Sequence, residues 1–220
     1  MIYELRRYTL HPGRRETLIE LFEREFVEPQ EAVGMRIAGT FRDPDAPDTF
    51  PWIRGFPDMA TRHAALTAFY SGPVWRAHRD AANATMIDSD DVLLLRSAIP
   101  IPAWDRPPVG ANETPAARYV ATIYHVEPGH VPGFAEFFAK TAVPVLTEAG
   151  VPPFACLETE HAENTFSALP VRAGENVFVW LARFADPGDE REIELPGLES
   201  RLTAPPRRLR LAPTARSSMR

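Results

Sequence analysis

The sequence predicts an α+β fold in which two ferredoxin-like βαββαβ repeats pack sheet to sheet and form one intramolecular α+β barrel. Three observations predict it: motifs that recur in order, the same alternation of strand and helix patterns in each half, and a proline-rich segment between the halves. The chain has 220 residues, of which 45% are hydrophobic, so it is long enough for two small domains with apolar cores.

The first observation is an internal repeat. The two copies are offset by 116 residues at the start of each half, and by 128 residues where 50–56 corresponds to 178–184. This change places an insertion of twelve residues between Thr159 and Asn176. The matches at the first offset are Tyr3, Tyr8, Pro12, Gly13, Phe22 and Gly34 with Tyr119, Tyr124, Pro128, Gly129, Phe138 and Gly150. An ordered series with one gap indicates a tandem duplication, and two copies are too few for a solenoid.

Proline marks the boundary between the copies. Five of the 23 prolines fall between Ile99 and Pro115, where they exclude a helix or a central strand. We expect a semi-extended linker there, held against a domain surface by Trp104. The predicted domains are a first repeat at 1–98, the linker at 99–116 and a second, partly eroded repeat at 117–215, each repeat within the usual size of a small domain.

The first repeat begins with a strand at 2–10, whose residues alternate in character and are rich in β-formers. Pro12-Gly13 ends this strand, and Leu18, Phe22 and Phe26 then form the apolar stripe of a helix. Two further strands, at 35–41 and 50–56, predict a hairpin around a turn rich in aspartate and proline.

A second helical region follows from Asp58 and is interrupted at Ser71-Gly72-Pro73, where Ser71 can cap the helix that resumes. Residues 92–96 predict the last strand of this repeat. The second repeat has a helix at 132–148, expected to kink at Pro144, and a last strand at 209–211. We expect its second helix to be eroded, because 186–199 contains two prolines and two glycines.

A four-stranded sheet with helices on one face leaves its other face without a partner, and two such repeats in one chain can cover each other. The barrel interior is then the expected place for a small-molecule cavity. Glu4, Arg6 and Tyr8 share one face of the first strand, and we expect that face to line the barrel. The matching face of the second repeat is less polar, which predicts a working site in the first repeat only.

These residues resemble the NIPSNAP family. The resemblance rests on the opening Tyr3-Glu4-Leu5-Arg6 with Tyr8 and Pro12-Gly13, and on Trp52-Ile53-Arg54-Gly55-Phe56 with Arg62 downstream. Trp75 before His78 and Arg79 also fits, and the second half keeps a weaker version of the pattern. The family is similar to dimeric α+β barrel proteins, which include cofactor-free monooxygenases and haem-binding chlorite-dismutase-like enzymes. The resemblance therefore implies the fold and leaves the reaction open.

Two groups of residues are candidates for a site. Glu4, Arg6 and Tyr8 offer an ion pair and a phenol that can bind or polarise a carbonyl-bearing ligand; the structural alternative is an internal salt bridge that fixes domain packing. Trp52 and Arg54 offer an aromatic wall with a cationic handle for a flat anionic ligand; the alternative is a core tryptophan beside an exposed arginine.

In an enzymatic mechanism, Arg6 or Arg54 would stabilise an enolate-like anion, and His78 or Glu4 would move the proton. The candidate catalytic residues are Glu4, Arg6 and His78, and the candidate ligand-binding residues are Tyr8, Trp52, Arg54 and Trp75. No histidine or carboxylate spacing is typical of a metal site, so we expect no metal, and no cofactor is predicted; a haem ligand has no positive indication.

Composition and net charge exclude several classes of protein. The net charge of −6 gives no overall attraction to nucleic acid, and no apolar run reaches the length of a membrane helix. The single cysteine, Cys156, excludes a disulfide framework and, with an N-terminus unlike a signal peptide, favours the cytoplasm. Arginine outnumbers lysine 23 to one, which favours a bacterial source. From Arg201 onward we expect a strand with solvated arginines and a frayed end.

The predicted function is binding of a small aromatic or carbonyl-bearing molecule in the barrel cavity, with cofactor-free oxygenation or isomerisation as the reaction if the protein is an enzyme. The sequence leaves that last point open. The alternative is a non-catalytic binding or scaffold protein with a filled barrel. We expect a small-molecule ligand, neither nucleic acid nor membrane as a partner, and either a monomer with an internal pseudo-dimer or a homodimer.

Overall fold

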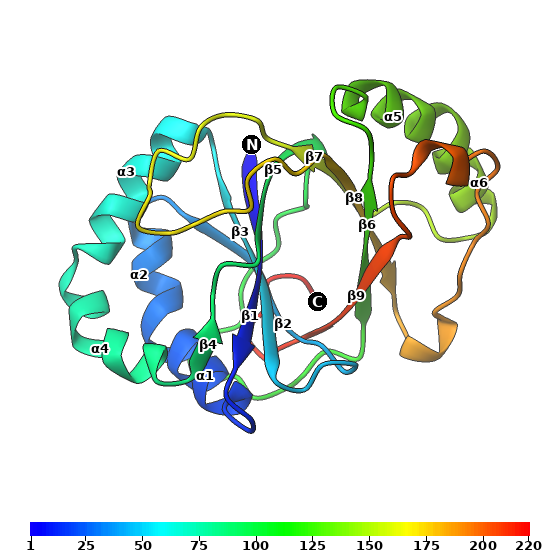
Figure 1. The fold of residues 1–220 in the computed structure, drawn as a ribbon. Coiled ribbons are helices and arrows are strands. Elements are labelled where there is room, and N and C mark those ends of the chain that lie inside the picture. Colours follow the sequence, from blue (N-terminus) through cyan, green and yellow to red (C-terminus); the bar gives the residue numbers. More distant parts are fainter.

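Each half of the chain supplies four long antiparallel strands to one barrel in the computed structural model, which describes residues 1–220 (Figure 1). The first half contributes β1 (Ile2–Leu10), β2 (Arg36–Arg42), β3 (Thr49–Phe56) and β5 (Val92–Ile99). The second half contributes β6 (Arg118–His125), β7 (Ala155–Thr159), β8 (Val177–Phe184) and β9 (Arg207–Pro213). A short strand that the sequence did not predict, β4 (Met86–Asp88), pairs with the end of β1.

The barrel closes because the edge strands of each half pair with those of the other. The β2 strand pairs with β9 and β5 pairs with β7, while β1 pairs with β3 and completes the ring. Such closure leaves no long edge free to add further strands. The predicted α+β barrel is confirmed, and the two halves follow the same order of strands. The duplication, the domain boundaries and the oligomeric state stay predictions.

Apolar side chains fill the barrel. Tyr3 and Leu5 of β1 point inward and pack with Ile53, Tyr119 and Leu181 from other strands. The C-terminal segment enters the ring of strands, where Met219 is buried and its N–H donates to the carbonyl oxygen of Ala38 (Figure 1). The expected small-molecule cavity inside the barrel is therefore wrong, and so is the expected frayed end.

Helices cover the outside of each sheet. In the first half, α1 (Arg15–Leu21) continues through a π-helical segment (Phe22–Phe26) into α2 (Val27–Ala32), and α3 (Met59–Tyr70) and α4 (Pro73–Asn83) lie beside them. In the second half, α5 (Val131–Phe137) continues through a π-helical segment (Phe138–Ala142) into α6 (Val143–Glu148). The two π segments start at positions that match in the sequence repeat, which shows how closely the two helices correspond.

The structure tests three predictions about helix ends and irregularities. The second helix of the second half is eroded as expected, to the 3-10 turns Pro187–Asp189 and Glu199–Arg201. The expected kink at Pro144 is wrong. The irregularity between α5 and α6 is the π-helical segment, and Pro144 occupies the first turn of α6, where proline is tolerated. Ser71 does not cap α4, because its hydroxyl donates back to the carbonyl oxygen of Thr67.

The proline-rich linker has neither helix nor strand between Pro100 and Ala117. Trp104 holds it in place as expected, with its ring centroid 5.3 Å from that of Phe154. None of the helices combines the length and the apolar character that a bilayer-spanning segment needs.

Candidate functional site

The polar face of β1 lies under the helices. Strand alternation sends Tyr3 and Leu5 into the barrel and therefore sends Glu4, Arg6 and Tyr8 to the opposite side, toward α1–α4. Our expectation that this face lines the barrel is wrong. The narrow interior is filled by the apolar set, while the layer between sheet and helices offers the charged set its hydrogen-bond partners. The candidate site is thus in the sheet–helix layer of the first half.

The centre of this site is one carboxylate held by three guanidinium groups. Glu4 Oε2 accepts from Arg6 Nη1 at 2.6 Å and from Arg54 Nε at 2.7 Å, and Glu4 Oε1 accepts from Arg62 Nε at 2.7 Å. Arg54 is the cross-strand neighbour of Glu4 on β3, and Arg62 comes from the first turns of α3. All four residues are fully buried. The alternative of an exposed arginine at position 54 is therefore wrong.

This cluster carries more positive than negative charge. Burial by itself would raise the pKa of Glu4, but Arg54, Arg6 and Arg62 outweigh burial and hold the pKa of this carboxyl well below its usual range. Burial lowers the pKa of Arg62; Glu4 opposes that shift, while the like charges of Arg54 and Arg6 add to it. A buried anion is therefore firmly ionised, and it balances only one of three cations.

A ring of neutral polar groups surrounds the charges. Arg6 Nε donates to the Tyr8 hydroxyl at 3.0 Å, and Arg54 Nη1 donates to Gln30 Oε1 at 3.3 Å and to the Tyr70 hydroxyl at 3.5 Å. Burial raises the pKa of Tyr8 although Arg6 opposes the shift, so the phenol stays protonated at neutral pH. Its proton is available to a ligand that carries an acceptor oxygen.

A small cavity adjoins this ring. It has a volume of about 30 Å³, enough for an ordered water molecule, and its wall is mostly hydrophobic but includes Tyr8, Gln30, Trp52, Tyr70 and Trp75. The Trp52 indole is buried, and its Nε1 has no hydrogen-bond partner. A buried donor without a partner costs free energy, so this N–H adds to the unmet demand for an acceptor.

The guanidinium groups do not line the cavity, but two of them pack against Trp52, which forms part of its wall. Arg6 and Arg54 lie 5.7 Å and 5.1 Å from the ring centroid of Trp52, within the range of cation–π attraction. Trp75 closes the cavity from α4 and packs edge to face on Tyr70, with ring centroids 4.8 Å apart. The two candidate groups, Glu4-Arg6-Tyr8 and Trp52-Arg54, thus form one site that also includes Trp75.

His78 lies apart from this site. Its Nε2 is 3.5 Å from Glu25 Oε2, and one-third of its side-chain surface is exposed. It does not line the cavity. Its expected proton-transfer role has no geometric support.

Four polar residues of the site, Arg62, Gln30, Tyr70 and Asn164, are absent from the candidate sets. Arg62 begins the buried stripe of α3 that continues with Ala65, Leu66 and Phe69, and an arginine at such a position signals a buried partner. Gln30 follows Phe22 and Phe26 at helical spacing and gives the same signal. Asn164 lies in the predicted insertion, where no periodic pattern marks it.

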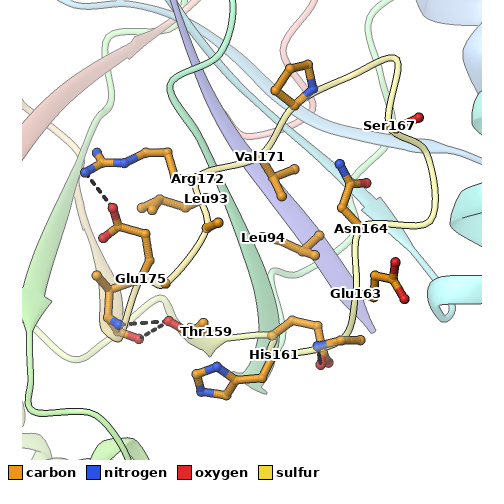
Figure 2. Close-up of a pocket in the computed structure, with 16 residues that line it drawn as sticks. Leu93, Leu94, Thr159, His161, Glu163, Asn164, Ser167, Val171, Arg172 and Glu175 are labelled. Atoms are coloured by element: carbon orange, nitrogen blue, oxygen red, sulfur yellow. Dashed lines mark hydrogen bonds and ion pairs between the residues drawn. The ribbon is translucent and has the colours of Figure 1, made fainter.

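A larger pocket, of about 480 Å³, lies where the β7–β8 connection folds over one end of the barrel (Figure 2). We call this connection, residues 160–176, the strap. Leu94 and Val171 form part of the apolar lining, and Arg172 is paired with Glu175 at 2.6 Å. No group of three or more His, Cys, Asp or Glu side chains is placed to hold a metal ion.

The second half has a matching layer that lacks charges at the corresponding strand positions, although Arg191, Glu192 and Arg208 also line its pocket. Val120, Thr122 and Ala182 stand where the first half has Glu4, Arg6 and Arg54, and they line a pocket of about 60 Å³. There the indole Nε1 of Trp180 donates to the Tyr124 hydroxyl at 3.1 Å. The predicted asymmetry between a polar and a bland layer is therefore present in the structure.

Comparison with known proteins agrees with the fold. Residues 3–99 match the NIPSNAP family. The resemblance seen in the sequence is thus confirmed for the first half, which holds the whole charge cluster. No curated protein matches the chain in a sequence search.

Three solved structures share the fold across both halves. A candidate monooxygenase from Fusobacterium nucleatum is 12% identical, with 97% of this chain and 92% of that chain covered and a TM-score of 0.63. A candidate monooxygenase from Lactobacillus acidophilus is 11% identical, with 98% and 96% covered and a TM-score of 0.57. An anthrone oxidase-like protein is 14% identical, with 97% and 91% covered and a TM-score of 0.53. At these identities the similarity establishes the architecture.

Proposed function

We propose that this protein binds a small planar anion, the enolate or phenolate of a carbonyl-bearing or aromatic molecule, in the sheet–helix layer of its NIPSNAP half and oxygenates it without a cofactor. One observation carries the proposal: a fully buried cluster of three arginines and one glutamate lies beside a small cavity lined by Trp52, whose buried indole N–H has no hydrogen-bond partner. Each uncompensated buried cation costs free energy that an anionic ligand would recover.

Each residue of the site has a separate role in binding the anion. Arg6 and Arg54 supply the field that stabilises the negative charge, since charges act strongly where water is excluded. The Tyr8 hydroxyl and Trp52 Nε1 donate hydrogen bonds to the oxygen of the anion. The positive electrostatic potential of Arg6 and Arg54 lowers the pKa of the ligand, so the ligand stays bound as its anion. Glu4 orients the three guanidinium groups; with its pKa held low and both oxygens occupied, it is a poor base.

The reaction proposed is oxidation of a CH₂ group, adjacent to a carbonyl or an aromatic ring, to C=O. The bound carbanion loses electrons to O₂; one oxygen atom forms the new carbonyl and the other leaves as water with the two hydrogens of the CH₂ group. The ligand supplies all four electrons, so the reaction balances with O₂ as the only co-reactant. Structural neighbours described as candidate monooxygenases and as anthrone oxidase-like support this reaction class.

A ring needs more space than the cavity provides. The wall most easily displaced is α4, because Ala82 is its only buried residue and the helix joins α3 through Ser71 and Gly72. Binding therefore requires α4, with Trp75, to move away from the sheet. We expect binding to change the tryptophan fluorescence.

The test uses anthrone as the probe for oxygen uptake, and both anthrone and 2-naphthol, which has no CH₂ group to oxidise, as probes for binding followed by tryptophan fluorescence. Tyr8→Phe is expected to weaken binding about tenfold, as for the loss of a hydrogen bond to a charged group. The matched Tyr124→Phe variant is expected to bind as the wild type does. Equal effects of the two substitutions would show that the first-half layer is not the site.

A non-catalytic binding or scaffold protein is the second candidate, and the filled barrel is the observation that favours it. In that case the charge cluster serves packing alone. Wild-type protein that binds neither probe and consumes no oxygen with anthrone would favour this candidate.

A further inference from the structure

The strap brings residues of the second half to the candidate site of the first half. In Figure 1 it leaves β7, crosses the end of the barrel and lies beside α3. Asn164 Oδ1 accepts from Arg62 Nη1 at 3.0 Å, and the carbonyl oxygen of Thr165 is 2.8 Å from His63 Nδ1. Phe166 packs on Tyr70, with ring centroids 5.9 Å apart. These contacts join the strap to two polar residues of the site, Arg62 and Tyr70.

The strap's own backbone fixes the Asn164 amide. Its Nδ2 donates to the carbonyl oxygen of Leu169 at 2.9 Å, and its Oδ1 also accepts from the N–H of Phe166 at 3.2 Å. These two bonds determine which end of the amide faces Arg62. The oxygen is therefore presented to the guanidinium group before any ligand arrives, as a preorganised contact requires.

We infer that Asn164 is a positioning residue of the first-half site: it holds the Arg62 guanidinium in place without neutralising it, so that the site of one half is completed by the other. An amide oxygen accepts a hydrogen bond yet carries no charge. A carboxylate in its place would bind Arg62 more strongly and would cancel much of the positive charge that attracts an anion.

The asymmetry of the two halves supports this inference independently. The connection between β2 and β3, which corresponds to the strap, is a short turn around Asp43–Asp48. The second-half layer, where Val120, Thr122 and Ala182 replace the charged residues, has no such cluster to position. Of these two corresponding connections, only the long one, the strap, reaches the charged layer, and it is the one in which the sequence predicts an insertion.

The state of Arg62 itself supports the inference. It is fully buried, burial lowers its pKa, and its Nη2 has no hydrogen-bond partner. Only Glu4 and Asn164 hold its guanidinium group through hydrogen bonds. Removal of the Asn164 amide leaves Nη1 without a partner as well and opens the layer toward the strap pocket, which Asn164 also lines (Figure 2).

The first measurement is independent of any ligand. Phenylglyoxal, which modifies accessible guanidinium groups, is applied to the folded protein, and the modified arginines are mapped by mass spectrometry. We expect Arg62 to be unreactive in the wild type and in Asn164→Asp, and to become reactive in Asn164→Ala while Arg6 and Arg54 stay protected. Arg62 that stays unreactive in Asn164→Ala overturns the inference.

The second measurement rests on the proposed function and uses 2-naphthol and anthrone as the probes. Asn164→Asp is expected to weaken probe binding about tenfold, because it places a negative charge beside Arg62, while the urea midpoint stays at or above that of the wild type. Ser167→Asp adds the same charge at an exposed position of the same strap and is expected to bind as the wild type does.

The two measurements separate the possible failures. A purely structural contact predicts that Asn164→Asp keeps or raises stability and leaves probe binding unchanged; that result overturns the inference. Wild-type protein that binds neither probe contradicts the proposed function alone, and phenylglyoxal labelling then decides whether Asn164 positions Arg62.

Discussion

The two sheet–helix layers of this molecule share their strand register and first helical region, but they differ in charge and in the second helical region, which the second half reduces to two 3-10 turns. In both, a tyrosine on the first strand lies near a tryptophan of the neighbouring strand, and the register is the same: Arg6 is opposite Trp52, and Thr122 is opposite Trp180. Only the first layer contains Glu4 and its three arginines; the second is uncharged at the matching strand positions, which hold Val120, Thr122 and Ala182.

This difference separates what the fold needs from what the charges add. The second layer forms the same strand register and the same kind of π-helical segment without a buried ion pair, so this backbone can form without such a cluster. Buried ion pairs can often be replaced by well-packed apolar residues at no loss of stability. The excess charge of the cluster therefore supports the proposed ligand, and the variants below test whether the first half needs the cluster to fold.

The largest expected effect follows from removing the only anion of the cluster. Glu4→Gln leaves three buried guanidinium groups without a counter-ion, so we expect the free energy of unfolding to fall by about 3–5 kcal/mol. Urea denaturation followed by circular dichroism measures the change. The control is Glu158→Gln, which breaks the pair with the half-exposed Arg96 and is expected to cost about 0–1 kcal/mol. Equal losses would mean that the cluster is no more demanding than a surface pair.

A second variant tests whether the first layer can be made like the second. Replacing the whole cluster at once, with Glu4→Leu, Arg6→Met, Arg54→Met and Arg62→Met, removes every charge and roughly conserves volume. We expect unfolding free energy within about 2 kcal/mol of the wild type, well above that of Glu4→Gln, together with complete loss of probe binding. A variant that fails to fold, while Glu4→Gln folds, would show that this half depends on its charges after all.

Local patterns predicted most of the fold. Period-two alternation in 2–10, helical stripes such as Leu18-Phe22-Phe26, and turn signals such as Pro12-Gly13 each act within a few residues, and all three gave the correct element. The repeat then predicted the barrel, because two sheets with bare faces can cover each other. The sequence also places Glu4, Arg6 and Tyr8 on one face of the first strand, and Trp52 and Arg54 on one face of another strand; the structure brings these two groups together.

What the sequence missed depends on long-range packing. Alternation divides β1 into two faces but does not say which face meets the helices, so the site was expected inside the barrel. The C-terminal segment shows no periodic pattern, yet Met219 fills the barrel end and the guanidinium of Arg216 pairs with Glu28. Asn164 reaches Arg62 across 102 positions, a contact that no local spacing encodes.

The pH dependence of stability gives a smaller effect that again separates the layers. The folded pKa of Glu4 lies below its ordinary value of 4.5, so the unfolded chain binds this proton first. The stability that Glu4 contributes is therefore fully present above about pH 4.5 and is lost as pH falls, by up to about 1.4 kcal/mol per pH unit. Urea titrations from pH 7 to pH 3 should show this extra slope in the wild type and not in the four-residue variant. Identical slopes would place the acid sensitivity elsewhere.

The smallest effect compares the two indoles. Trp180→Phe removes the hydrogen bond to Tyr124, whereas Trp52→Phe removes a donor that has no partner, and phenylalanine keeps an aromatic face for Arg6 and Arg54 in the first layer. Because both indoles are buried, the packing lost by the two substitutions is similar. We therefore expect Trp180→Phe to lower the free energy of unfolding by about 1 kcal/mol more than Trp52→Phe does.

A double-mutant cycle sharpens this comparison of the two indoles. Trp180→Phe combined with Tyr124→Phe should show a coupling energy of about 1 kcal/mol, and Trp52→Phe combined with Tyr8→Phe a coupling energy near zero. Probe binding should respond in the opposite sense, weakened by Trp52→Phe and unchanged by Trp180→Phe. A coupling of equal size in both layers would show that the Trp52 N–H is already satisfied, and the demand for an acceptor in the first-half cavity would then come from the arginines alone.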